Sequence, residues 1–108
     1  MSQNTSKQPI FYPDTQAQAV FGANGPQPQF LVDDATFKVI VGGLEPGQRI
    51  PLHPESLAMY HFVTGTGTMT VDEEQFPITA GATVITSAGA RRGIQAETRV
   101  VFLAAKPV

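Results

Sequence analysis

Short runs of β-branched and aromatic residues recur roughly every ten residues between positions 36 and 104, and each run ends at glycine, proline or acidic turn residues. One example is the run 36–44, TFKVIVGGL, which is followed by the turn sequence EPG. The expected strands are 36–44, 59–63, 68–71, 75–78, 82–86, 93–96 and 99–104. No segment is long enough for a helical crossover. This rhythm predicts an all-β fold, an antiparallel barrel or sandwich of at least seven strands.

The length of 108 residues limits the chain to one domain, and its 42% of hydrophobic residues suffice for a core. Residues 1–9 are polar, which predicts a disordered tail. Residues 10–32 contain apolar runs broken by prolines and glycines, which is typical of an arm or short edge strands. We therefore expect a barrel domain over 10–108 with an N-terminal arm over 10–32.

Composition excludes several classes of function. The seven Lys and Arg residues form no basic stripe and the net charge is −2, so nucleic acid is not an expected partner. Without cysteine, a metal would have to be bound by His, Asp or Glu. No apolar run has the length of a secretory signal or a membrane span, so we expect a cytoplasmic protein without a membrane partner.

Two segments carry a family likeness. Residues 46–67 read PGQRIPLHPESLAMYHFVTGTG, and residues 76–93 read FPITAGATVITSAGARRG. Together they resemble the two signature motifs of the cupin superfamily. In the first motif, Gly47 and His53 match the family pattern, whereas Glu55 stands at the second His position and Ala58 at the Glu position. Two of the three ligands of this motif are therefore replaced.

In the second motif, Gly81 and Gly89 match the pattern, while Arg92 stands at the position of the family's histidine. The resemblance implies a double-stranded β-helix, or jelly-roll barrel. It also implies that the family's metal shell of three His and one Glu is reduced here to His53 and Glu55. A fold does not by itself transfer a reaction.

His53 and Glu55 are two residues apart, so on an extended strand both side chains leave the same face. They are the candidate ligands for a divalent metal such as Fe, Mn, Ni or Zn. Iron and zinc sites take at least three protein ligands, and the permanent charge of Arg92 repels a divalent cation. The main expectation is therefore that no cofactor is bound.

Arg92 has two interpretations. It could form a structural ion pair with Glu55 across the barrel mouth. Alternatively, its planar guanidinium could bind a carboxylate or phosphate of a small ligand, with His53 and Tyr60 as further hydrogen-bond partners. Its neighbour Arg91 should point to the other face, toward solvent.

Strand parity separates the side chains of residues 58–63. Because Ala58 occupies an inward position of the motif, Tyr60 and Phe62 should also face the cavity. Met59, His61 and Val63 should face outward, toward the arm or a partner subunit.

The first hypothesis is a binding module whose cavity holds a small polar or anionic molecule through His53, Glu55, Tyr60, Phe62 and Arg92. The alternative is an enzyme, either a metal-dependent dioxygenase or isomerase using His53, Glu55 and one further ligand, or a metal-free enzyme using His53 as a general base. The apolar but interrupted arm also predicts a homodimer, because in proteins resembling this one an N-terminal strand commonly packs on the neighbouring subunit.

Overall fold

A computed structural model describes residues 8–108, and nearly all of its regular structure is β. One 3-10 turn, Thr15–Gln18, precedes the strands. The strands are β1 Gln29–Asp33, β2 Phe37–Leu44, β3 Arg49–Pro54, β4 Ala58–Thr64, β5 Gly67–Val71, β6 Glu74–Ile78, β7 Thr83–Thr86, β8 Arg91–Ala96 and β9 Val100–Pro107. In the described part of the chain, no helix is long and apolar enough to cross a membrane.

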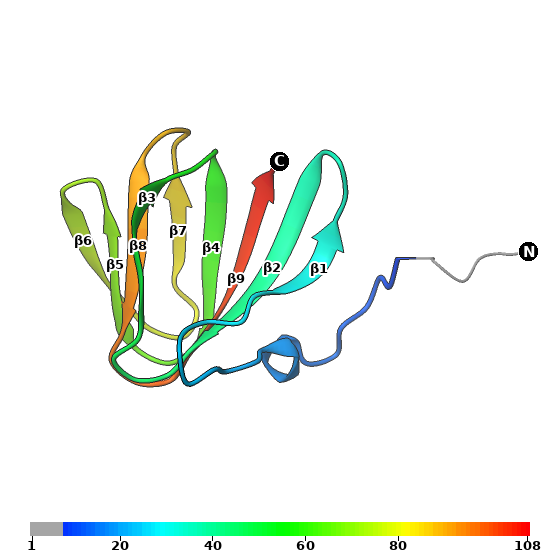
Figure 1. Ribbon diagram of the computed structural model, residues 1–108, viewed down its shortest axis with the longest axis horizontal. Coiled ribbons are helices and arrows are strands. Elements are labelled where there is room, and N and C mark those ends of the chain that lie inside the picture. The colour runs from blue at the N-terminus through cyan, green and yellow to red at the C-terminus, as the bar shows by residue number, and fades with distance from the viewer. Residues whose placement is uncertain (1–7) are drawn as a thin grey trace, which may run out of the picture.

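The strands form two antiparallel sheets that face each other (Figure 1). The five-stranded sheet has the order β1-β2-β9-β4-β7, and the four-stranded sheet has the order β3-β8-β5-β6. Neighbours in each sheet come from distant parts of the sequence, as β9 does between β2 and β4. This arrangement is a jelly roll, so the predicted all-β fold class is confirmed.

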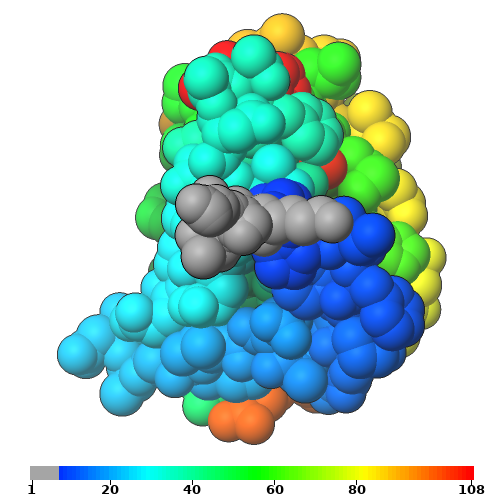
Figure 2. All heavy atoms as spheres, turned by 90° about the vertical axis from the view of Figure 1, so that its right-hand side faces the viewer, coloured from blue at the N-terminus to red at the C-terminus, as the bar shows by residue number. Residues whose placement is uncertain are grey.

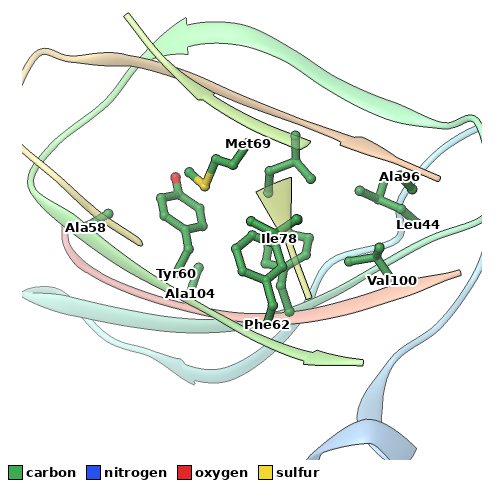
Figure 3. Close-up of a cluster of buried hydrophobic side chains, with 11 residues drawn as sticks. Leu44, Ala58, Tyr60, Phe62, Met69, Ile78, Ala96, Val100 and Ala104 are labelled. Atoms are coloured by element: carbon green, nitrogen blue, oxygen red, sulfur yellow. The ribbon is translucent and has the colours of Figure 1, made fainter. Parts of the chain in front are cut away.

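The core lies between the two sheets, as Figure 3 shows. Alternate residues of β4, namely Ala58, Tyr60 and Phe62, are buried, whereas Met59 and His61 are half-buried on the outer face. The parity predicted for this strand is therefore confirmed. The opposite wall of the core comes mainly from β5, β6 and β8, through Met69, Ile78 and Ile94.

The segment before β1 runs across the lower part of one side of the body (Figure 2). Phe21 packs on Gly43, where an added Cβ would lie only 2.9 Å from the Phe21 ring. The Arg99 guanidinium stacks 4.0 Å from the centroid of the same ring and pairs with the Glu45 carboxylate at 2.9 Å. These contacts hold the arm to the base of the sheets. The tail expected over residues 1–9 lies mostly outside the described residues, and Gln8 and Pro9 have no regular secondary structure.

Candidate ligand-binding site

A cavity of about 160 Å³ opens between the two sheets. Its walls are mainly apolar side chains of β2, β3, β8 and β9, including Ile40, Ile50, Ile94 and Phe102. Its polar lining residues are His53, Glu55, Tyr60, Arg92 and Lys106. Four of the five residues predicted to bind a ligand therefore meet at one cavity, and they are joined by Lys106.

Arg92 is almost completely buried, with 1% of its surface exposed. Its guanidinium donates hydrogen bonds to four main-chain carbonyl oxygens: from Nε to Ala90 at 2.9 Å, from Nη1 to Ser56 at 2.8 Å, and from Nη2 to Ser87 at 3.0 Å and Glu55 at 3.3 Å. These carbonyls lie on the β3–β4 and β7–β8 loops. Arg92 therefore ties two loops together.

This geometry corrects both interpretations of Arg92. The guanidinium has five N–H donors and uses them on the chain's own carbonyls, so it does not present a free fork to a ligand. It contacts the main chain of Glu55, and the carboxylate of Glu55 pairs with another residue. What Arg92 adds to the cavity wall is a buried positive charge. Arg91, one residue earlier, is exposed as predicted.

The partner of the Glu55 carboxylate is Lys106, whose Nζ lies 2.8 Å from Oε2. This hydrogen bond, together with one from the Ser56 amide, lowers the pKa of Glu55 against the opposing effect of burial. Lys106 was not foreseen from the sequence because it stands beside Pro107 near the last residue. Its signal was the alternation of inward residues on β9, which continues from Phe102 and Ala104 to Lys106.

His53 faces Arg92 across the β3–β8 pair. Its Nδ1 lies 3.0 Å from the carbonyl oxygen of Pro51. Because a carbonyl can only accept, Nδ1 carries a proton, and in the neutral imidazole Nε2 keeps its lone pair. His53 can therefore accept a hydrogen bond from a molecule in the cavity through Nε2.

The donor set is poor for a metal. His53 and Glu55 both line the cavity, but within residues 8–108 no three His, Cys, Asp or Glu side chains come close enough to hold one ion. Lys106 and Arg92 place two cations beside the pair. The third ligand that a metal-dependent enzyme requires is therefore not supplied by the described residues.

Tyr60 and Phe62 differ in their access to the cavity. Tyr60 projects from β4 into the space between the sheets (Figure 3), lines the cavity and is 7% exposed. Its hydroxyl forms no hydrogen bond with any of the described residues, which is unusual for a buried polar group. Phe62 is fully buried, packs against Phe102 with ring centroids 6.1 Å apart, and is not a lining residue. Phe62 supports the core.

Comparisons with known proteins agree with this architecture. The family model described as "Cupin domain" matches residues 40–105, which is more than half of the chain. No protein of curated function matches the sequence.

Solved structures resemble the chain over nearly its whole length. A conserved protein of unknown function from Streptococcus pyogenes is 21% identical, with a TM-score of 0.82 over 99% of this chain and 95% of that one. A cupin superfamily protein from Desulfitobacterium hafniense is 12% identical, with a TM-score of 0.81 over 100% and 99% of the two chains. A predicted oxalate decarboxylase from Thermotoga maritima is 22% identical, with a TM-score of 0.70 over 77% and 80%. At these identities the likeness concerns the fold alone, and together with the family match it shows that this chain is a small single-domain member of the cupin family.

Proposed function

We propose that this protein binds a small organic anion, with an apolar body inside the cavity and its charged group at Lys106. The observation that carries the proposal is an excess of positive charge in an otherwise apolar cavity. Arg92 and Lys106 contribute two cations to the lining and Glu55 one carboxylate. Arg92 has no carboxylate partner, because all its hydrogen bonds go to neutral carbonyls. An anion would balance this charge.

The volume and the remaining polar groups limit the size and shape of the ligand. A cavity of about 160 Å³ has room for about five water molecules at the density of liquid water, which corresponds to a small molecule. The unpaired hydroxyl of Tyr60 and Nε2 of His53 could each bond one polar atom of it. Short aliphatic or aromatic monocarboxylates have this combination of an apolar body and a single charge.

Binding should respond in opposite directions to the two partners of the Glu55–Lys106 pair. Lys106→Met removes the cation and leaves Glu55 to repel an anion, so affinity for butyrate or benzoate should fall about tenfold or more. Glu55→Gln frees Lys106 from its ion pair, so affinity should rise several-fold. Calorimetry with butyrate and benzoate measures both changes, and butyramide and benzamide are the uncharged controls. Lys38→Met provides a matched lysine control, because Lys38 pairs with Asp33 away from the cavity.

Equal binding of the acids and their amides would contradict the proposal, and so would a Glu55→Gln variant that binds the acids more weakly. Elemental analysis tests the metal-dependent alternative. That alternative uses His53 and Glu55 as ligands, and it would be supported by iron, manganese, nickel or zinc at about one atom per chain.

We also propose that the protein is a homodimer. In the arm, Ile10 and Phe11 are 90% and 75% exposed, which is costly for two large apolar side chains on one segment. A second copy could cover them together with the half-buried outward residues Met59 and Val63 of β4. Two such surfaces related by a two-fold axis close on themselves.

Sedimentation at micromolar concentration should therefore give about twice the monomer mass of 11.5 kDa. The double variant Ile10→Ser/Phe11→Ser should shift the protein toward the monomer. Leu52→Ser, on the other sheet and 40% exposed, should leave the mass unchanged. A wild-type protein that sediments as a monomer at this concentration would refute the dimer.

A further inference from the structure

A second and larger depression lies between β6 and β7, the last strands of the two sheets. This cleft has a volume of about 1120 Å³ and shares no lining residue with the cavity described above. Figure 1 shows the β5–β6 hairpin projecting beyond the five-stranded sheet at this side of the molecule. The inner face of the hairpin is therefore not fully covered by the opposite sheet.

The edge of β7 has free backbone groups. β7 pairs only with β4, and the Phe62 amide donates to the Ala82 carbonyl at 2.8 Å. Because bonded and non-bonded pairs alternate in an antiparallel ladder, Val84 bonds to β4, whereas the N–H and C=O groups of Thr83 and Ile85 point away from it. Both residues line the cleft. Such an edge is a template for another strand.

The edge of β6 is different. Pro77 stands opposite Thr68 in the β5–β6 pair, and it has no N–H to offer on its outer side. β6 instead contributes an apolar surface. Phe76 pairs with the buried Met69, so it faces the cleft, and it is 36% exposed. A segment in the cleft would thus bond to β7 and pack on Phe76.

The charge of the cleft selects its occupant. Asp72, Glu73 and Glu74 line one end, and Arg91 is the only cation among the described lining residues. The carboxylate of Asp72 is used within the turn, where it accepts a hydrogen bond from the Arg91 amide at 2.9 Å. Those of Glu73 and Glu74 form no ion pair with any described residue. A partner with positive charge at this end would be attracted.

We propose that the cleft binds an extended basic peptide segment of another protein, added as a strand to the free edge of β7. Backbone hydrogen bonds to Thr83 and Ile85 would hold the segment, apolar side chains would pack on Phe76, and lysines or arginines would face Glu73 and Glu74. This recognition is independent of the small-molecule cavity.

The test uses a fluorescein-labelled heptapeptide of alternating lysine and valine with the full-length protein at low salt, followed by fluorescence anisotropy. The peptide should bind saturably. The same peptide N-methylated at alternate residues along one edge should bind about tenfold more weakly, because it loses the hydrogen bonds to β7. A peptide of alternating glutamate and valine should bind weaker still. Equal binding of parent and N-methylated peptides would overturn strand addition, and equal binding of the basic and acidic peptides would overturn the charge selection.

Variants of the protein locate the site. The double variant Glu73→Gln/Glu74→Gln should weaken binding of the basic peptide about fivefold at low salt. Glu97→Gln, which removes an exposed carboxylate outside the cleft lining, should leave the affinity unchanged. Benzoate at a concentration that fills the cavity should not displace the peptide. Loss of affinity in Glu97→Gln equal to that in the double variant, or displacement by benzoate, would overturn the assignment to this cleft.

Discussion

Replacing Arg92 by methionine should destabilise the protein by about 3–5 kcal/mol, far more than an average surface substitution. Methionine fills a similar volume but donates no hydrogen bond. The carbonyls of Ser56, Ser87 and Ala90 would lose their guanidinium partner at the junction of two loops. Urea unfolding followed by circular dichroism measures the change. Hydrogen exchange at the Gly89 amide, which donates to the Glu55 carbonyl at 2.8 Å, should accelerate as the loops separate.

Two further variants separate this structural role from a simple charge effect. Arg91→Met removes the same charge one residue earlier, where the side chain is exposed, and should change stability by less than about 0.5 kcal/mol. Arg92→Lys keeps the charge but lacks the planar fork that reaches both loops, so its stability should lie between those of wild type and Arg92→Met. If Arg92→Lys equalled wild type, the buried charge alone would account for the effect.

Gly65→Ala should be the most disruptive single-methyl change in the chain. Gly65 has a φ of 92°, a value that L side chains adopt with strain. An added Cβ would also collide with the Arg99 carbonyl oxygen and lie 2.8 Å from the Val100 Cα. Both atoms belong to main chain at the start of a central strand, so they cannot move aside cheaply. We expect a loss of about 4 kcal/mol or more, measured as a fall in the urea midpoint and in soluble yield.

Gly47→Ala is the matched control. Gly47 has a similar φ of 85°, but nothing lies within 4 Å of the position of an added Cβ. This variant should show only the backbone penalty of about 1–2 kcal/mol. The difference between the two variants therefore measures the collision at Gly65. Equal losses would show that strain in φ accounts for both.

Much of the fold could be predicted from the sequence because strand periodicity and turn chemistry are local. The run 36–44 becomes β2 at Phe37–Leu44, and the run 59–63 becomes β4 at Ala58–Thr64. β1 was harder to see, because the apolar run at 30–32 is short and follows several prolines and glycines within the expected arm.

The candidate site was predictable only in part. Parity placed His53, Glu55, Tyr60 and Arg92 at one cavity, and all four line it. Parity could not show that Arg92 would spend its donors on loop carbonyls, because loop conformation has no periodic signal. Nor could it show that Lys106 would reach Glu55, since that contact depends on the register of β9 with both of its neighbours.

The position of Lys106 on β9 has a consequence for the kinetics of binding. β9 is hydrogen-bonded on one side to β2 through Pro107 and on the other to β4 through Ala105. A cation on such a strand is held in place before any ligand arrives, so little backbone order has to be acquired when one binds. Association should then be a single fast step whose rate grows linearly with ligand concentration, without the plateau that a closing lid produces.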